Sequence, residues 1–235
     1  MAAETVTPMF DRIAHRYDLL NRLLSFGQDQ GWRRRVLQFL PPRRAMHVLD
    51  MATGTGDLAM SMVQYSPAIG EVVGLDLSGN MLEIGKRKVL RAGQSGKITL
   101  QKGDAMAIPF ADESFDAVTI AFGIRNVVDC KAALSEMYRV LKPSGRVIVL
   151  EFSLPENALL RCCYLFYFRH VLPVLGGFIS GNKEAYRYLN QSVEHFPYGA
   201  RFVSMMRTVG FHDVQCNPLT FGVASIYCGE KGDRP

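Results

Sequence analysis

The chain has 235 residues, of which 48% are hydrophobic and 21% are charged, and its formal net charge is +5. This composition is that of a folded globular protein and excludes disordered and collagen-like chains. The positive charge is mild and no aromatic residues alternate with the basic runs, so we expect no nucleic-acid partner. The five cysteines include no C-x-x-C pair, which favours a reducing compartment over a disulfide framework or a zinc site. We expect a cytoplasmic protein that holds no metal.

The N-terminal sequence carries acidic residues and lacks the apolar core of a signal peptide. The longest apolar stretch, residues 159–179, contains Arg161, Arg169, His170 and Pro173, and charges at these positions argue against a membrane span. We therefore expect a protein that touches a membrane surface at most peripherally.

From residue 45 onward, short apolar segments alternate with amphipathic segments of helical period. The apolar segments predict five strands, at residues 46–52, 71–77, 98–104, 115–123 and 145–152. The amphipathic segments between them predict helices at residues 57–66, 78–92 and 129–141. Strands that are apolar on both faces and separated by helices predict a parallel sheet covered on both sides.

After Pro155 this alternation gives way to aromatic-rich sequence of helical character, followed by a helix near residues 199–209. Two strands then follow around Asn217 and Gly222 without a helix between them, which predicts an antiparallel edge. The sequence thus predicts an α/β fold with a mostly parallel seven-stranded sheet and helices on both faces. We divide the chain into an N-terminal helical lid (1–44) and a main domain (45–235), with a helical insert on the substrate side (155–196).

A glycine-containing loop follows the first predicted strand, where ligands bind in open parallel sheets. Gly54 and Gly56 leave room there for close approach of a ligand. Asp76 ends the second strand and could accept hydrogen bonds from two ribose hydroxyls. Together with Ala59, the loop fits the pattern G-x-G-x-x-A, which by itself is equally compatible with a dinucleotide.

The end of the third strand favours an adenosyl ligand without a pyrophosphate. Asp104 and the backbone amide of Ala105 could bind the edge of an adenine ring. Asp57 would repel a pyrophosphate but suits a ligand with a zwitterionic amino-acid tail and a sulfonium; the alternative is that Asp57 caps the following helix. Three strands that end in acids (Asp50, Asp76 and Asp104) resemble the Rossmann-like class of S-adenosylmethionine-dependent methyltransferases.

Two further segments are more specific: residues 17–32 (YDLLNRLLSFGQDQGW) and 139–153 (RVLKPSGRVIVLEFS) resemble the two signature segments of the UbiE/MenG family of quinone C-methyltransferases. Residues 122–127 (FGIRNV) and 186–193 (YRYLNQSV) are similar to two other stretches of that family. The resemblance covers almost the whole chain. It implies methyl transfer from S-adenosylmethionine to a ring carbon of a reduced polyprenyl quinol, either demethylmenaquinol or the benzoquinol precursor of ubiquinone.

The resemblance also implies a set of site residues. The donor would be bound without a metal by seven residues: Gly54, Thr55, Gly56, Asp76, Asp104, Ala105 and Ala121. Tyr17, Asp18, Asn21 and Asp29 would lie on the substrate side. His170 is a further substrate-side residue and a weaker candidate for a base, and the alternative for it is an ordinary core histidine. The catalytic residues would be Arg125 and Asn126.

The roles of the two catalytic candidates stay open at this point. Arg125 would stabilise the quinolate anion or orient a water that takes the proton, because an arginine is almost never neutral in a protein. The alternative for Arg125 is a structural ion pair with Asp129 or Glu151. Asn126 would bind a ring oxygen, or it would cap the next helix.

The sequence departs from the family's pattern at three positions. Leu20 stands in place of a methionine, which nearly conserves volume, and Ser144 in place of a glycine in a turn, which we expect to matter little. Asp29 stands in place of a histidine. A carboxylate could replace a histidine base only with a different pKa, whereas little changes if this residue merely closes the pocket.

Three other functions compete with this interpretation. A methyltransferase of the same fold could act on another lipid or phenol. A nicotinamide-dependent oxidoreductase is disfavoured by Asp57 and Asp104, and a non-catalytic donor-binding subunit by Arg125.

The aromatic insert could hold a polyprenyl tail or be an ordinary buried helix pair. The WRRR run, with Arg43 and Arg44, would suit anionic headgroups. Tail length and a possible homodimer stay open.

Overall fold

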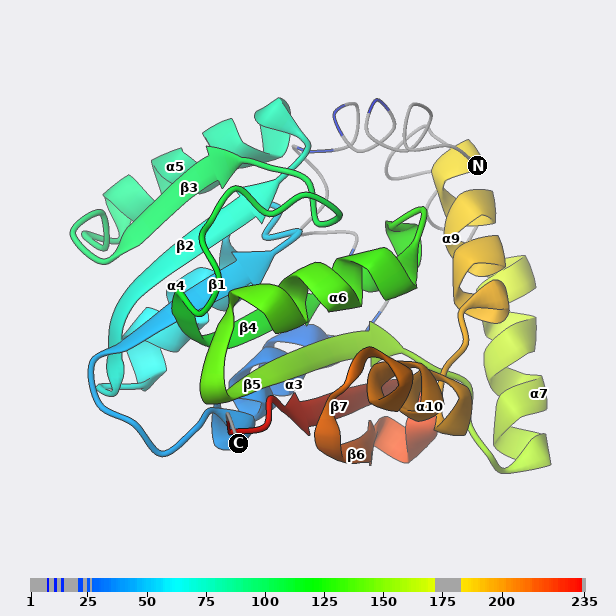
Figure 1. The fold of residues 1–235 in the computed structure, drawn as a ribbon. Helices are drawn as coiled ribbons and strands as arrows, with labels where there is room; N and C mark the ends of the chain where they lie inside the picture. Colours follow the sequence, from blue (N-terminus) through cyan, green and yellow to red (C-terminus); the bar gives the residue numbers. More distant parts are fainter. Residues whose placement is uncertain are drawn as a thin grey trace.

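The structure is a computed structural model that describes residues 27–171 and 183–233 together with Pro8, Asp11, Ala14, Asn21, Arg22 and Ser25. Its centre is a seven-stranded sheet with the order β3-β2-β1-β4-β5-β7-β6 (Figure 1). The strands are β1 (Met46–Met51), β2 (Ile69–Asp76), β3 (Ile98–Lys102), β4 (Phe115–Ala121), β5 (Leu141–Phe152), β6 (His212–Leu219) and β7 (Ala224–Glu230).

The strands β3, β2, β1, β4 and β5 pair in parallel, whereas β7 runs antiparallel to both of its neighbours, β5 and β6. The predicted α/β fold with a mostly parallel sheet and an antiparallel edge is therefore confirmed. The reversed strand is β7, which lies between β5 and the outermost strand, β6. Pro218 is on the outermost strand, where the missing backbone N–H costs no ladder hydrogen bond to a second neighbour.

Helices cover both faces of the sheet (Figure 1). One face carries α3 (Gln28–Val36), α4 (Asp57–Tyr65) and α5 (Gly79–Arg91), and the other carries α6 (Cys130–Val140) and α10 (Ala200–Val209). Short helical turns form η2 (Leu37–Phe39), η3 (Ile124–Asn126) and η5 (Thr220–Gly222). Side-chain caps define three helix starts: Ser78 caps α5, Asp129 caps α6 and Asn157 caps α7 (Ala158–Phe166).

The α7 helix continues into the π-helical turn η4 (Tyr167–Val171), and α9 (Lys183–His195) packs beside this segment. Arg169 forms an ion pair with Glu194, and Asn190 donates a hydrogen bond to the carbonyl of Phe168. In the part of the chain that the structure describes, no helix is long and apolar enough to cross a membrane.

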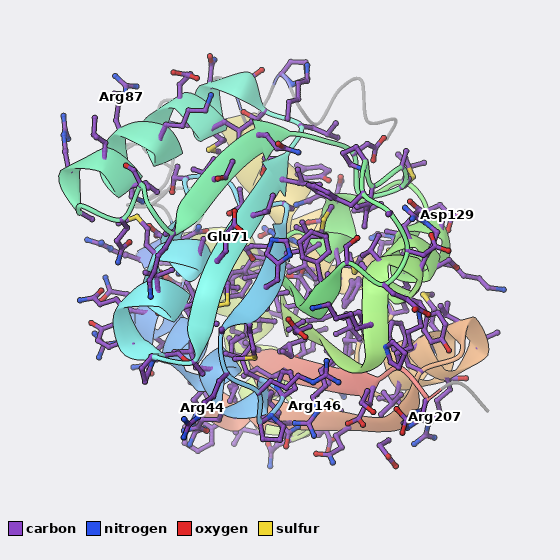
Figure 2. All side chains as sticks on the ribbon, turned by 60° about the vertical axis from the view of Figure 1, so that its left-hand side comes forward. Arg44, Glu71, Arg87, Asp129, Arg146 and Arg207 are labelled. Atoms are coloured by element: carbon purple, nitrogen blue, oxygen red, sulfur yellow. The ribbon has the colours of Figure 1, made fainter. Side chains whose placement is uncertain are left out.

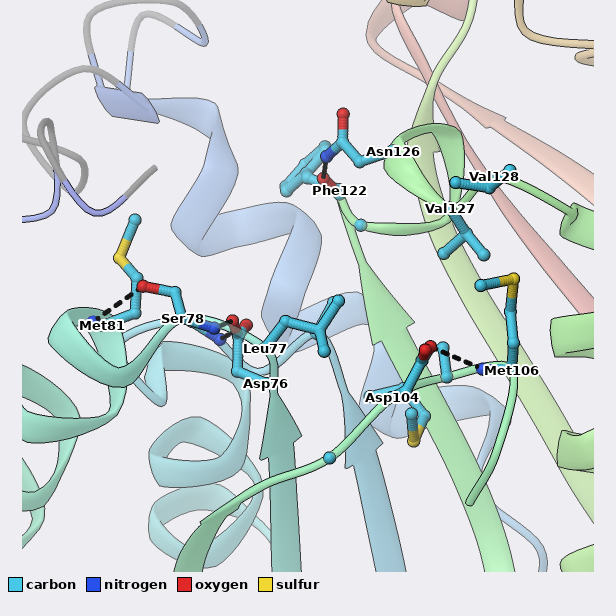
Figure 3. Close-up of a pocket in the computed structure, with 16 residues that line it drawn as sticks. Asp76, Leu77, Ser78, Met81, Asp104, Met106, Phe122, Asn126, Val127 and Val128 are labelled. Atoms are coloured by element: carbon cyan, nitrogen blue, oxygen red, sulfur yellow. Dashed lines mark hydrogen bonds between the residues drawn. The ribbon is translucent and has the colours of Figure 1, made fainter. Parts of the chain in front are cut away.

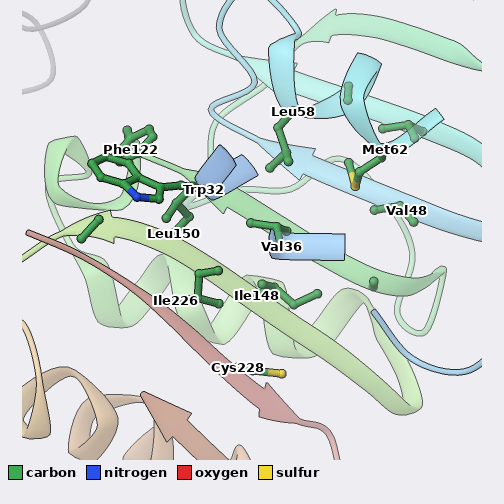
Figure 4. Close-up of a cluster of buried hydrophobic side chains, with 14 of the residues drawn as sticks. Trp32, Val36, Val48, Leu58, Met62, Phe122, Ile148, Leu150, Ile226 and Cys228 are labelled. Carbon is green, nitrogen blue, oxygen red and sulfur yellow. The ribbon is translucent and has the colours of Figure 1, made fainter. Parts of the chain in front are cut away.

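The hydrophobic core forms one layer on each face of the sheet because successive strand residues point to opposite sides. In β1, Val48 packs into one layer and Leu49 into the other. Figure 4 shows the first layer, in which Trp32 and Val36 of α3 lie among sheet residues. Gln28–Val36 therefore contributes to the core, although the sequence assigned it to the lid. The domain boundary at residue 45 stays a prediction.

Two strands begin earlier than the sequence indicated. The β2 strand starts at Ile69, and β5 starts at Leu141, where the sequence predicts the last residue of a helix. The start of β5 is irregular: Phe115 of β4 pairs with Leu141, but Ala117 pairs with Arg146. The extra residues on β5 form a bulge that alternating hydrophobicity does not reveal.

Ser144 lies in this bulge with a left-handed backbone, at φ = 56°. A left-handed conformation costs a residue with a Cβ atom roughly 1–2 kcal/mol. Ser144→Gly should therefore raise the free energy of unfolding by about 1 kcal/mol, contrary to the expectation that this position matters little. Chemical unfolding of both proteins measures the difference.

Ser144→Ala is the matched control, because it keeps the Cβ strain and removes the hydroxyl that contacts Asp233. We expect this variant to be no more stable than the wild type. A glycine variant that gains no stability would show that the hydroxyl contact outweighs the strain.

Candidate active site

One pocket opens at the carboxyl ends of the central parallel strands (Figure 3). It encloses about 810 Å³ of empty space, its open mouth included. Four strand ends contribute to its wall, through Ala52 after β1, Asp76 of β2, Asp104 after β3 and Phe122 after β4. Because β1 lies between β2 and β4, the connections on its two sides wind in opposite directions and leave a crevice there.

Asp76 is fixed on one side of the pocket. Its Oδ2 accepts a hydrogen bond from the backbone N–H of Gly54 at 2.8 Å, and its Oδ1 accepts one from Ser78 at 2.8 Å. Burial raises the pKa of Asp76, although backbone hydrogen bonds from Ser78, Gly54 and Leu77 act in the opposite direction. A carboxylate has about four lone-pair sites, so these three bonds leave capacity for a further hydroxyl donor.

Asp104 lies on the other side of the pocket, on the loop after β3 (Figure 3). Its Oδ1 accepts a hydrogen bond from the N–H of Met106 at 2.9 Å. Arg139 of α6 holds the rest of this loop by donating to the carbonyls of Ile108 and Phe110. The acid at the end of β3 is thus supported by a helix on the far side of the sheet.

The glycine loop between β1 and α4 has left-handed backbone at Ala52 (φ = 47°), Gly54 (φ = 56°) and Gly56 (φ = 82°). Residues with a Cβ atom rarely adopt this conformation, and such strain is often found at ligand sites. Gly85 of α5 lies against the loop, since a Cβ atom there would be 3.1 Å from the carbonyl carbon of Thr55. The close packing of α5 therefore supports the conformation of the glycine loop.

Asp57 is the first residue of α4 and forms an ion pair with Lys88 of α5. Lys88 also donates to the hydroxyl of Thr55 at 3.0 Å. The helix-capping interpretation of Asp57 is wrong, because the N-cap residue is Gly56. With Lys88 as its partner, Asp57 is also less suited to a ligand's amino-acid tail.

A second, smaller cavity adjoins the first pocket and shares Ala52 and Gly54 with it. Thr55 and Ala121 line this cavity, not the first pocket. Asp50 lies here with its carboxylate held by two hydroxyls, from Thr53 at 2.6 Å and Thr119 at 2.7 Å.

Arg33 of α3 also lines the second cavity, and it forms a buried ion pair with Asp29, one helical turn earlier. Asp29 accepts a further hydrogen bond from the hydroxyl of Ser25 at 3.0 Å. Asp29 does not line either of these two cavities. The carboxylate in place of the family's histidine therefore has a defined partner.

Arg125 and Glu151 form a buried ion pair, with 2.6 Å between Nη1 and Oε1 and side chains that are 5% and 0% exposed. Nη1 also donates to the carbonyl of Phe122 at 2.6 Å. Of the two carboxylates that the sequence left open as partners, Glu151 is the one that binds. Arg125 does not line the pocket, and its Nε has no hydrogen-bond partner among the described residues.

Asn126 does line the pocket. Its Oδ1 accepts a hydrogen bond from the hydroxyl of Tyr188 at 3.0 Å, and its Nδ2 contacts the carbonyl of Phe122 at 3.4 Å (Figure 3). The helix-capping interpretation of Asn126 is wrong, because the side chain of Asp129 caps α6.

The other substrate-side predictions have different outcomes. Tyr17 and Asp18 lie outside the described residues. Asn21 is 7% exposed, and its Nδ2 has no hydrogen-bond partner in the part of the chain that is described. His170 is exposed on η4, with its ring 5.1 Å from that of Phe166, and is not a lining residue of the pocket.

Sequence reasoning missed Arg33 and Thr53 of the second cavity, and Thr119, which donates a hydrogen bond to Asp50. One signal for Arg33 was available, because Asp29 and Arg33 have the i, i+4 spacing of a helical ion pair. No metal-binding group of three or more His, Cys, Asp or Glu residues occurs within the described ranges.

The chain matches the model of the ubiE/COQ5 methyltransferase family over residues 1–231. It belongs to this family. It is 50% identical over 228 residues to the ubiquinone/menaquinone biosynthesis C-methyltransferase UbiE of Geotalea daltonii, which covers 97% of each chain. It is 50% identical over 223 residues to the demethylmenaquinone methyltransferase of Thermus thermophilus, which covers 95% of this chain and 100% of that one.

A solved structure from Thermotoga maritima, a SAM-dependent methyltransferase, is similar with a TM-score of 0.67 and 21% identity, over 96% of this chain and 99% of that one. This likeness shows the fold. The predicted family is thus confirmed, the protein is a methyltransferase, and S-adenosylmethionine is its methyl donor.

The free energy of unfolding should depend on pH through the carboxyl group of Asp50. Burial raises its pKa from 3.8 to about 6, against hydrogen bonds from Thr53 and Thr119 and the charge of Arg33, while Asp76 adds to the rise. Between these two values the folded protein keeps a proton that the unfolded chain has lost, so stability falls as the pH rises toward 6. Asp50→Asn should remove this loss, which amounts to about 3 kcal/mol at 1.36 kcal/mol per pKa unit.

Thermal unfolding of both proteins between pH 4 and 7 tests this, and the stability of the variant relative to the wild type should increase up to about pH 6. Asp116→Asn is a control of opposite sign, because hydrogen bonds from His47, Lys142 and Arg43 outweigh partial burial and lower the pKa of Asp116. Parallel curves for wild type and Asp50→Asn would refute a raised pKa.

Proposed function

We propose that the protein methylates a ring carbon of a reduced polyprenyl quinol, with demethylmenaquinol as the first candidate and the polyprenyl benzoquinol precursor of ubiquinone as the alternative. The names of the two relatives support C-methylation in quinone biosynthesis. The observation that carries the proposal is one pocket in which a donor clamp (Gly54, Asp76 and Asp104) and an apolar wall with one amide (Phe122 and Asn126) face each other.

The donor clamp fits an adenosyl ligand. Asp76 would accept a hydrogen bond from the ribose, and Asp104 with Ala105 would bind the adenine edge. When bound, S-adenosylmethionine supplies an electrophilic methyl group on a sulfonium. The clamp residues lie at the ends of β3, β2 and β1 and would orient the donor there, beside the residues that follow β4.

The acceptor must bind as the quinol, because a ring carbon becomes nucleophilic when the neighbouring hydroxyl is ionised. The amide of Asn126 is the polar group in the apolar part of the pocket, and it can hold a ring oxygen as negative charge develops. Its orientation depends on the hydroxyl of Tyr188 and the carbonyl of Phe122.

Arg125 is assigned a positioning role in this proposal. Glu151 neutralises its charge at 2.6 Å, so the guanidinium adds little field at the pocket. Both Arg125 and Asn126 instead contact the carbonyl of Phe122, a residue with left-handed backbone (φ = 57°) whose ring lines the pocket. The ion pair thereby stabilises a strained turn that shapes the acceptor side.

Peripheral membrane contact is part of the proposal and rests on α7. This helix exposes Leu159 (73%), Leu160 (42%) and Phe166 (63%), with Arg161 also exposed among them. Such a surface suits the interface where a polyprenyl substrate resides.

The WRRR run (residues 32–35) and Arg43 are less suited than expected to binding anionic lipid headgroups. Arg33 of this run is buried, and Arg43 pairs with Asp116. Other charged side chains, such as Arg44 and Arg87, point away from the ribbon (Figure 2).

Turnover should require a reduced acceptor. We expect product formation from a demethylated naphthoquinol kept reduced with dithionite, and none from the oxidised quinone, because the oxidised ring has no hydroxyl to ionise. Donor binding to the enzyme, measured separately, serves as the control that the protein is intact. Equal rates with the quinone and the quinol would contradict carbon attack by a quinolate.

Asn126→Ala should lower kcat by roughly 10²–10³-fold, the cost of losing one preorganised donor, with donor affinity nearly unchanged. Tyr188→Phe removes the hydrogen bond from the Tyr188 hydroxyl to Asn126 but keeps the Asn126 amide. The loss of kcat in this variant should therefore be much smaller. Arg125→Ala should instead lower stability by about 3–5 kcal/mol, because it leaves Glu151 buried and unpaired.

Single-turnover rates and unfolding curves on the same preparations distinguish these roles. A stable Arg125→Ala protein with a 10²-fold or larger rate loss would assign the anion-stabilising role to Arg125 and not to Asn126.

A further inference from the structure

Arg139 is the first residue of the segment 139–153, which resembles a signature of the family, yet it does not line the pocket. Its guanidinium binds the loop between β3 and β4, and this loop places Asp104 and Met106 on the pocket wall (Figure 3). Two anchors hold the loop, one on each side of the residues that line the pocket. The second anchor depends on Arg139.

The first anchor lies before the lining residues of the loop. The backbone N–H of Gly103 donates a hydrogen bond to the carbonyl of Asp76 at 3.1 Å, so the loop leaves the sheet beside the end of β2. Asp104 then forms a tight turn. Its carboxylate accepts a hydrogen bond from the N–H of Met106 at 2.9 Å, and its carbonyl accepts one from the N–H of Ala107 at 3.2 Å.

The second anchor lies after the lining residues and is the ion pair of Glu136 and Arg139, three positions apart on α6. Ile108 is bound at both of its backbone groups: its N–H donates to Glu136 at 2.9 Å, and its carbonyl accepts from Arg139 at 2.9 Å. Arg139 also donates to the carbonyl of Phe110 and to the carboxylate of Asp112, each at 2.8 Å. Two side chains thus supply hydrogen bonds that a neighbouring strand would otherwise provide.

The ion pair that forms this anchor has a defined geometry. Nε and Nη2 of Arg139 face the two oxygens of Glu136, each at 2.8 Å, which is a bidentate arrangement. Hydrogen bonds from Arg139 lower the pKa of Glu136 against the effect of burial, so the pair is charged at neutral pH. The planar guanidinium fixes direction as well as distance, and a lysine cannot reproduce it.

We propose that Arg139 is a positioning residue for recognition of the donor's base: by fixing the end of the loop, it holds the carboxylate of Asp104 where that group accepts a hydrogen bond from the 6-amino group of adenine. The inference rests on the proposed function, in which Asp104 and Ala105 bind the adenine edge. Only residues 104–107 separate the two anchors, so a displacement of Ile108 shifts the carboxylate of Asp104. Loss of the guanidinium should therefore reduce the discrimination between bases.

The test compares two ligands that differ in the base alone. S-adenosylhomocysteine has an amino group at position 6 of the purine, whereas S-inosylhomocysteine has an oxygen there, which would face the carboxylate of Asp104 as a second acceptor. Isothermal titration of the wild type should show a preference for the adenine ligand. Arg139→Ala should lower this preference by about 10-fold, the low end of the loss expected for a hydrogen bond to a charged group.

Arg146→Ala is the matched control. Arg146 of β5 pairs with Glu230 of β7 at 3.1 Å, and neither residue lines the pocket. The side chains of this pair are 32% and 27% exposed, against 31% and 23% for Arg139 and its partner Glu136. The control should therefore lose a similar ion pair and keep the full base preference. Arg139→Lys, which restores the charge without the fork, should retain part of the preference.

A double variant shows whether Arg139 acts through Asp104. Asp104→Ala should remove most of the base preference by itself. Adding Arg139→Ala to that variant should then change the ratio of the two affinities no further. A purely structural role predicts instead that Arg139→Ala has a lower melting temperature and the full base preference, and this result would overturn the inference.

If Arg139→Ala does not fold, Arg139→Lys and Glu136→Gln decide the question: each should lower the base preference, and the full preference in both would overturn the inference. An Arg146→Ala protein that loses as much preference as Arg139→Ala would overturn it as well. A wild-type protein that binds both ligands equally would instead contradict the assignment of Asp104 to the adenine edge in the proposed function, and with it this inference.

Discussion

The carboxylate of Asp50 connects the parts on which the site depends. Its hydrogen bonds to Thr53 and Thr119 join the glycine loop after β1 to the neighbouring strand β4, at the place where the winding of the sheet reverses. This connection keeps the left-handed loop in place between two cavities. The proposed clamp residues and the apolar wall of the first pocket lie around this junction, so under the proposed function its geometry would set where the methyl group is transferred.

Three ion pairs lie around this junction. Arg33 with Asp29, Lys88 with Asp57 and Arg125 with Glu151 each join a basic residue to an acid near the pocket. The pairs of Arg33 and Arg125 are buried, and a buried pair contributes little net stability but holds side chains in defined places. Arg125 donates to the carbonyl of Phe122 at the turn after β4, whereas Arg33 pairs with the acid one helical turn before it.

The sequence predicted the parts of the fold and site that depend on local pattern. Apolar alternation located the strands, and because parallel strands end at one edge, Gly54, Asp76 and Asp104 were expected together and lie around one pocket. It did not predict contacts made by distant elements. The choice of Glu151 over Asp129 for Arg125 depends on β5 lying beside β4, and the contact between Tyr188 and Asn126 depends on how α9 packs against η3. Neither spacing nor periodicity contains that information.

The position of the transferred methyl group distinguishes carbon methylation from every other use of this pocket. We would incubate the protein with donor labelled with a trideuteromethyl group and with reduced demethylmenaquinol, and then locate the label in the product by mass spectrometry and NMR. We expect one trideuteromethyl group on a ring carbon, with both hydroxyls intact. Label on a ring oxygen, as a methyl ether, would contradict the assignment of the pocket to carbon methylation, and so would the absence of label from the quinol.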